Sequence, residues 1–145
     1  MTNLLKKSLF LSAVLFAQLG FSQSHAAGNE AMQLEDWDRA IAIFSGLTQA
    51  NPGDQSAFLS LGNAFLAKGD KANAEKNFKS AFDAKSDAPM AFVANGRILL
   101  LQNKTAEAEK QFAKAKKYAK KADTSLSSMV ENYLKAVASE KKVQN

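Results

Sequence analysis

The sequence predicts an all-α fold in which antiparallel helix pairs stack into a solenoid. Three observations predict it: residues of one class recur at a constant offset of 34, apolar residues within each unit lie three and four positions apart, and turn-forming residues separate the expected helices. The chain has 145 residues, of which 46% are hydrophobic. This length and composition suffice for one domain with its own core.

The period is carried by columns of equivalent residues that keep register without gaps. Three columns each repeat a single residue type: Gly28, Gly62 and Gly96; Ala40, Ala74 and Ala108; and Phe44, Phe78 and Phe112. Three more columns are apolar: Phe58, Phe92 and Leu126; Ala31, Phe65, Leu99 and Tyr133; and Leu47, Ala81 and Ala115. Six columns in one register indicate tandem repeats. We expect the glycines to lie where two helices approach closely, because glycine inside a helix is otherwise unfavourable.

Residues 1–26 have the organisation of a secretory signal peptide. Lys6 and Lys7 precede an apolar run of 14 residues, and Ser24 and Ala26 supply the small side chains that a signal peptidase requires. The run is shorter than the roughly 20 residues of a transmembrane helix. We therefore predict cleavage after Ala26, with Ala27 as the alternative position, and a soluble mature chain that is exported to the periplasm or secreted. An uncleaved helix that tethers the protein to a membrane is the alternative.

The mature chain divides into three helical units and a final helix. The first unit, residues 27–54, is shortened, because its first helix begins near Ala27 and keeps about two turns. Residues 55–88 and 89–122 form complete units, and residues 123–145 form a capping helix and tail, which gives seven helices in all. The apolar side of the capping helix is formed by Leu126, Met129, Val130, Tyr133, Leu134 and Val137. A solenoid needs such a helix to cover its last apolar face.

Turn residues fall where the period requires a boundary. Gly69 and Asn103 occupy equivalent places at the end of a helix, and both residue types tolerate the left-handed backbone conformation. Asp54, Asp70 and Asp87 precede expected helices. Because a carboxylate can accept hydrogen bonds from the free amides of a first turn, we expect all three to act as N-caps.

The units resemble the tetratricopeptide repeat family, whose units have about 34 residues and two antiparallel helices. The clearest match is FLSLGNAFLAKGDKANAEKNFKSAF at residues 58–82, and GNEAMQLEDWDRAIAIFSGL at residues 28–47 follows the same pattern. The third stretch, FVANGRILLLQNKTAEAEKQFAKA at residues 92–115, is looser, because Asn95 and Asn103 replace the expected leucine and glycine. The resemblance implies a right-handed solenoid that binds a peptide or a partner helix on its concave surface.

The concave surface that the resemblance implies is formed by the first helix of each unit. On this sequence it comprises Asn29, Gln33, Leu59, Asn63, Leu66, Val93, Arg97, Leu100 and Leu101. We interpret these residues as an apolar groove whose amides can bond to a peptide backbone and whose guanidinium suits a carboxylate. The alternative is that they are ordinary solvated or half-buried helix positions. We expect another protein or peptide as the partner.

The positive charge of the chain is concentrated toward its C-terminus. Residues 104–145 carry 10 lysines and 5 acidic residues, whereas residues 27–103 carry 7 basic and 9 acidic residues. Four lysines fall on one helical stripe: Lys110, Lys114, Lys117 and Lys121. As an alternative function, this stripe attracts an anionic membrane or cell-wall polymer. It otherwise reads as the solvated face of an outer helix. We do not expect a nucleic acid as partner, because no aromatic residues alternate with the lysines to stack on bases.

No motif indicates an enzyme. The chain has no cysteine, and its one histidine, His25, lies in the predicted signal peptide. Histidine and cysteine supply most general acid–base groups and zinc ligands. There is also no glycine-rich phosphate loop and no nucleophile elbow. We therefore expect a non-enzymatic protein without a catalytic, cofactor or metal site.

Overall fold

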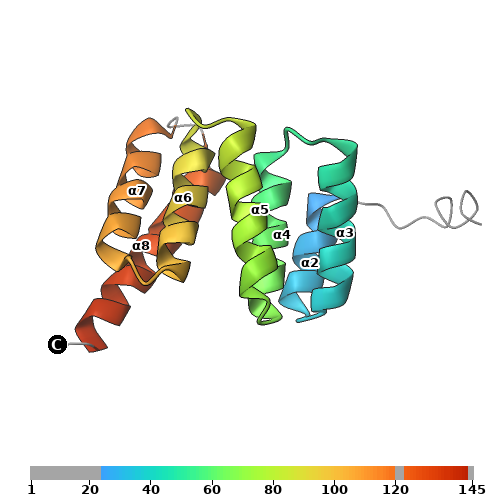
Figure 1. Cartoon of the computed structure of the whole chain (residues 1–145), viewed down its shortest axis with the longest axis horizontal. Helices are drawn as coiled ribbons and strands as arrows, with labels where there is room; N and C mark the ends of the chain where they lie inside the picture. The colour runs from blue at the N-terminus through green and yellow to red at the C-terminus, as the bar shows by residue number, and fades with distance from the viewer. Residues whose placement is uncertain (1–23, 120–122, 144–145) are drawn as a thin grey trace, which may run out of the picture.

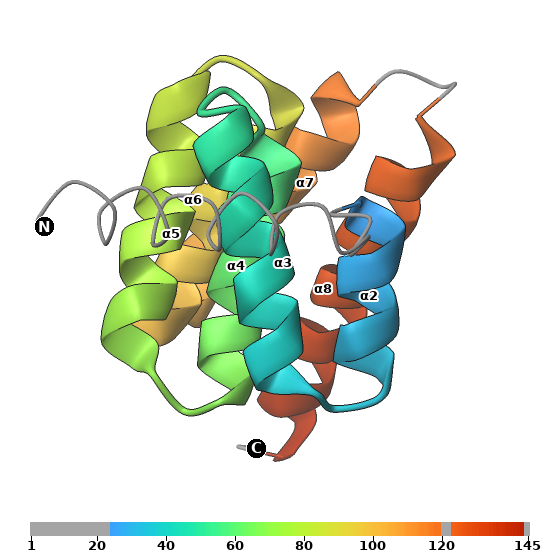
Figure 2. The same ribbon diagram turned by 90° about the vertical axis from the view of Figure 1, so that its right-hand side faces the viewer.

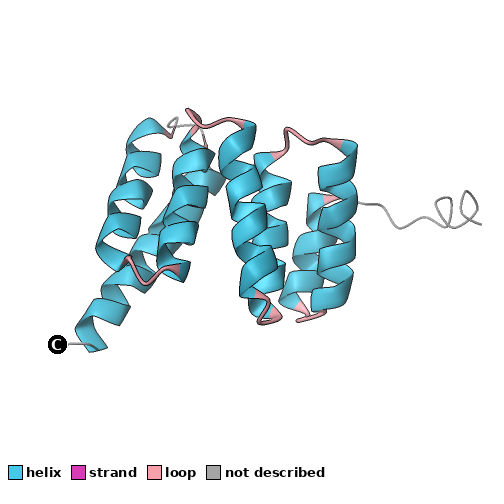
Figure 3. Cartoon of the chain, viewed as in Figure 1, coloured by secondary structure: helices cyan, strands magenta, loops and turns pink. Residues whose placement is uncertain are grey.

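The computed structural model describes residues 24–119 and 123–143, and these form seven α-helices and no strand (Figures 1 and 3). The helices are α2 (His25–Gln33), α3 (Trp37–Ala50), α4 (Gln55–Ala67), α5 (Lys71–Ala84), α6 (Pro89–Leu101), α7 (Thr105–Tyr118) and α8 (Thr124–Val143). The predicted all-α fold is confirmed. Most of the predicted signal peptide, residues 1–23, lies outside the described residues, as does Lys121.

The helices form three antiparallel pairs that stack side by side, followed by α8. Each helix packs against its neighbours in the chain, and α4 also contacts both α2 and α6, so the first helices of the pairs lie in one layer. In the view from the right-hand end of Figure 1, α2 and α8 lie on one side of the molecule and α5 on the other (Figure 2). This arrangement is the solenoid that the repeat period predicts.

Aspartates cap several helices. The Asp54 carboxylate accepts a hydrogen bond from the Ala57 amide at 2.9 Å, and the Asp70 carboxylate accepts one from the Asn73 amide at 3.0 Å, as predicted. The prediction for Asp87 is wrong. Because Pro89 takes the first helical position, the N-cap of α6 is Ala88, which has no side-chain acceptor, and Asp87 stands one residue too early.

In each helix pair, one residue after the end of the first helix adopts the left-handed backbone conformation. Gly69 has φ 88° and Asn103 has φ 58°, which confirms the expectation for both residues. Glu35 takes the same conformation with φ 56° and stands 34 residues before Gly69. This role of Glu35 was not predicted, although the residue occupies the same place in the repeat as Gly69 and Asn103. A non-glycine residue in this conformation is uncommon, and the repeated turn requires it.

Each pair is held together by a phenylalanine that fills the space left by a glycine. Phe44, Phe78 and Phe112 are fully buried. A Cβ atom built on Gly62 would lie 2.5 Å from the Phe78 ring, and equivalent atoms on Gly28 and Gly96 would lie 2.5 Å from the rings of Phe44 and Phe112. Real Cβ atoms do not approach so closely, so the expected close approach at the glycines is confirmed. Burial of each ring contributes roughly 1.5 to 3 kcal/mol.

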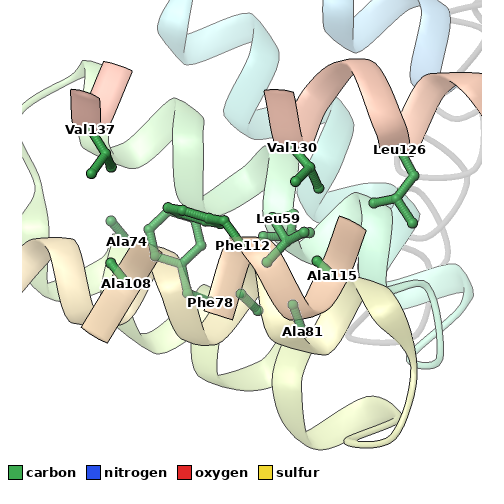
Figure 4. Close-up of a cluster of buried hydrophobic side chains, with 12 residues drawn as sticks. Leu59, Ala74, Phe78, Ala81, Ala108, Phe112, Ala115, Leu126, Val130 and Val137 are labelled. Carbon is green, nitrogen blue, oxygen red and sulfur yellow. The ribbon is translucent and has the colours of Figure 1, made fainter. Parts of the chain in front are cut away.

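The phenylalanines join one unit to the next. Phe78 and Phe112 belong to one cluster of buried apolar residues (Figure 4). The cluster also contains alanines of α5 and α7, Leu59 of α4, and Leu126, Val130 and Val137 of α8. The core is therefore continuous from the second unit to the final helix.

The first helix begins two residues before the predicted start at Ala27. The Ser24 hydroxyl accepts a hydrogen bond from the Ala27 amide at 3.1 Å and so caps α2. His25 Nε2 lies 2.8 Å from Asp54 Oδ2 and ties α2 to the start of α4. Burial acts to raise the pKa of Asp54, but hydrogen bonds from the Ala57 amide and from His25 outweigh it and leave that pKa lowered.

Candidate functional site

The predicted groove residues come from the inner layer of helices, α2, α4 and α6, but they differ widely in exposure. Asn29 and Gln33 of α2 are exposed, whereas Leu59 and Val93 are 2% and 0% exposed. Leu66, Leu100 and Leu101 are half-buried and pack against the core. The groove prediction is therefore corrected for Leu59 and Val93, since each lies in the contact between neighbouring helices and presents no surface to a partner.

The polar centre of the inner face is formed by Asn63 and Arg97, which occupy equivalent places in α4 and α6. The Arg97 guanidinium lies 5.2 Å from the centre of the Phe78 ring and 5.0 Å from that of the Tyr133 ring. Asn63 Nδ2 donates a hydrogen bond to the Tyr133 hydroxyl oxygen at 3.3 Å. Residues that are 34 positions apart in the sequence thus meet at one aromatic ring from α8.

Aromatic rings hold the Arg97 guanidinium in place. Cation–π contacts of this kind contribute about 0.5 to 2 kcal/mol each, more where water is excluded. Arg97 makes no ion pair within the described part of the chain, whereas Arg39 lies 3.9 Å from Glu30. A positioned guanidinium without a carboxylate partner, beside a primary amide, is suited to bind a carboxylate or a backbone carbonyl.

Tyr133 is the site residue whose second role the sequence did not predict. Its column, with Ala31, Phe65 and Leu99, predicts a core position in the capping helix. Its ring does stack on Phe112 at 5.0 Å with an interplanar angle of 15°, but it also reaches α4 and α6 across the inner face. Tyr133 of α8 therefore covers the polar centre of the inner face, and this part is not the open groove that we expected.

The lysine stripe lies on α7, and its described members are exposed: Lys110, Lys114 and Lys117. Lys114 Nζ lies 5.9 Å from the centre of the Phe92 ring, and Lys117 Nζ lies 5.8 Å from that of the Tyr118 ring. The two rings stack at 5.7 Å, and Tyr118 is 57% exposed. An exposed aromatic residue thus stands among the lysines, although α7 shows no aromatic alternation in sequence.

Within residues 24–119 and 123–143, no three acidic or histidine side chains come together as metal ligands could. Nor does any helix of this part combine the length and apolar character that a membrane span requires. The features of interest are therefore the inner face and the lysine stripe.

Two family models match the chain. A tetratricopeptide repeat model matches residues 25–89 and again residues 59–123. Together the two overlapping matches cover all three helix pairs, α2 to α7. A model of a family of unknown function matches residues 108–145, which include α8. No curated protein matches the chain.

Solved structures share the fold at low sequence identity. A chain of a type III secretion complex from Aeromonas hydrophila is 20% identical with a TM-score of 0.58, over 94% of this chain and 97% of that one. PcrH from Pseudomonas aeruginosa, in complex with the chaperone binding region of PopD, is 24% identical with a TM-score of 0.57, over 81% and 90%. The Yersinia enterocolitica chaperone SycD, in complex with a peptide of the translocator YopD, is 22% identical with a TM-score of 0.55, over 80% and 90%.

Proposed function

Because the chain belongs to the tetratricopeptide repeat family, we propose that it is an interaction scaffold that binds a peptide or a helix of another protein on its inner face. One observation carries this proposal. The Arg97 guanidinium is held against two aromatic rings, beside the Asn63 amide, and has no carboxylate partner in the described part of the chain. Because this guanidinium forms no ion pair within the described residues, it can pair with a ligand that takes the place of the Tyr133 ring.

Related folds support a peptide or protein partner. PcrH and SycD are both solved with segments of other proteins, and the first tetratricopeptide domain of Spaghetti is solved with an HSP90 peptide. In each of these structures a similar helical scaffold holds a segment of another protein. We infer a partner of this class here, and a binding role without catalysis.

Export is part of the proposal and rests on the sequence alone. The lysines, apolar run and small residues of positions 1–26 favour transport out of the cytoplasm and cleavage after Ala26. On this basis the scaffold works in the periplasm or outside the cell. N-terminal sequencing of the exported protein tests this, because a chain that still begins at Met1 would contradict cleavage.

Replacing both polar residues of the inner face, Asn63→Ala with Arg97→Ala, is expected to abolish partner capture. Loss of a charge-assisted hydrogen bond and an amide contact weakens binding by roughly 2 to 4 kcal/mol, which is 30-fold or more. The measurement is affinity capture from the exported fraction with the mature chain, followed by titration of the captured protein.

The matched control changes an amide and a cation on the outer helix α5, Asn77→Ala with Lys76→Ala. It is expected to bind the partner as the unaltered chain does. Circular dichroism checks that both variants fold. Undiminished capture by a folded Asn63 and Arg97 variant would exclude the inner face as the binding site.

The exposed lysines favour a second candidate function, contact with an anionic surface. Lys110, Lys114 and Lys117 make no ion pair with the described residues, and the exposed Tyr118 ring beside them has the amphipathic character that suits a membrane interface. This patch lies on α7 and is separate from the inner face.

Neutralising the three lysines to glutamine is expected to weaken retention on vesicles that contain phosphatidylglycerol. Each lysine near such a surface contributes about 1 kcal/mol, so the loss is about 100-fold at low salt. Vesicle sedimentation measures it, with neutral phosphatidylcholine vesicles as the control. Equal retention of the variant and the unaltered chain would rule out this second function.

A further inference from the structure

The final helix occupies the part of the inner face that the proposed function assigns to a partner. The Tyr133 hydroxyl lies 3.3 Å from Asn63 Nδ2, and its ring lies 5.0 Å from the Arg97 guanidinium. These contacts join α8 to α4 and α6, the inner helices of two units. A partner that binds to Asn63 and Arg97 must therefore take the place of Tyr133.

This cover leaves polar atoms of the site unsatisfied. Asn63 Oδ1 and Arg97 Nε are both buried, and neither finds a hydrogen-bond partner in the described part of the chain. Turning the Asn63 amide over does not remove the problem, because one of its two polar atoms then still faces away from the hydroxyl. Each buried unsatisfied group lowers the population of the covered arrangement about fivefold or more. The contact of Tyr133 with the inner face is thus weaker than its burial suggests.

The helix α8 also packs against α7 and contributes Leu126, Val130 and Val137 to the buried cluster. The two helices are neighbours along their backbones, and their pairing is reinforced by an ion pair between Lys116 and Glu131 at 3.1 Å. Val130 and Val137 of α8 point toward the Phe112 ring (Figure 4). In Figure 1, α8 runs obliquely behind α6 and α7 instead of standing upright in the stack. One side of α8 is therefore packed against α7, and its polar and cation–π contacts with α4 and α6 are made through Tyr133.

We propose that α8 is a displaceable cover, a built-in occupant of the inner face that a partner segment replaces. This inference rests on the proposed function, since it concerns the same site. The partner segment that fits carries an aromatic side chain for the place of Tyr133, an acceptor for Arg97 Nε and a donor for Asn63 Oδ1. A backbone peptide group supplies both the acceptor and the donor. Displacement of α8 then satisfies the two polar atoms that the covered arrangement leaves unpaired.

Hydrogen exchange on the full chain without any partner tests whether the unsatisfied polar atoms of Asn63 and Arg97 destabilise the contact of α8 with the inner face. Asn63→Leu removes the unsatisfied amide at nearly constant volume, so the amides of α8 are expected to exchange about fivefold more slowly. Tyr133→Ala is expected to speed their exchange about tenfold. The amides of α3, which α8 does not contact, serve as the internal control and should not change in either variant.

The opposite outcome overturns the proposal. If Asn63→Leu speeds the exchange of α8, or leaves it unchanged in a chain with the circular dichroism of the original, the amide supports the closed arrangement and α8 is a fixed cap. This measurement needs no partner. The exchange result can therefore contradict a displaceable α8 even if partner capture depends on Arg97. Conversely, it can support a displaceable α8 even if partner capture does not depend on Arg97. The two proposals are thus tested separately.

A crosslink tests displacement directly. The chain has no cysteine, so Lys116→Cys with Glu131→Cys can be joined specifically by a short bis-maleimide that fixes α8 to α7. The probe is a fluorescent peptide of residues 124–143, which competes with α8 for its own place. We expect the crosslinked chain to bind it at least tenfold more weakly than the same variant before crosslinking. Equal binding in the two states would contradict a displaceable α8.

Discussion

Phe78→Ala is expected to destabilise the chain by about 3 to 5 kcal/mol, a large share of a small domain's total stability. The ring is fully buried and links the second unit to the third, where it also contacts the Arg97 guanidinium. Its removal leaves a cavity that the surrounding alanines are too small to fill. Urea unfolding followed by circular dichroism measures the loss, and partner capture should fall with it.

Phe82 provides the matched control for this change. It lies four residues later on the same helix but is only half-buried. Phe82→Ala is expected to destabilise by less than about 2 kcal/mol, because less apolar area is returned to water. Equal losses for the two variants would mean that Phe78 is not the residue that joins the units.

Gly62→Leu is expected to destabilise by about 3 kcal/mol, near the upper end of the range for overpacking. The first added carbon alone would lie 2.5 Å from the Phe78 ring, which is enclosed on all sides and cannot move freely. The substitution gains about 1 kcal/mol of helix propensity, which is too little to offset the clash. Thermal and urea unfolding of the variant give the net effect.

The pairing of Gly62 with Phe78 can be separated from effects on either residue alone. A double variant combines Gly62→Ala with Phe78→Leu. The leucine side chain is smaller than the phenylalanine ring and makes room for the methyl group of the alanine. The double variant is therefore expected to be at least about 1 kcal/mol more stable than the sum of the single changes predicts. Strict additivity would show that the glycine and the ring do not depend on each other.

The fold was predictable because the repeat places chemically distinctive residues in register. A glycine and a phenylalanine that recur together 34 residues apart have one simple explanation, a helix pair that closes over a ring, and the structure has that contact three times. Caps were predictable where an aspartate directly precedes a helix. Asp87 was assigned wrongly because Pro89 sets the start of α6 one residue further on.

The inner face was predictable in part. A helical period assigns residues to faces but does not say which other helices each face contacts. In this stack α4 packs against α2, α3, α5 and α6, and α6 packs against α4, α5 and α7. Leu59 and Val93 are buried for this reason. The contact of Tyr133 with Asn63 spans 70 residues and depends on the tilt of α8, which no local pattern encodes.

We propose that a partner binds on the inner face and is held there by Arg97. Site-specific photo-crosslinking in cells that naturally express the full chain tests it most directly, with the photoreactive residue at Gln33 on the inner side of α2 or at Lys76 on the outer helix α5. We predict one protein adduct from position 33, its loss on Arg97→Ala, and none from position 76. The same adduct from position 76, unaffected by Arg97→Ala, would contradict the claim.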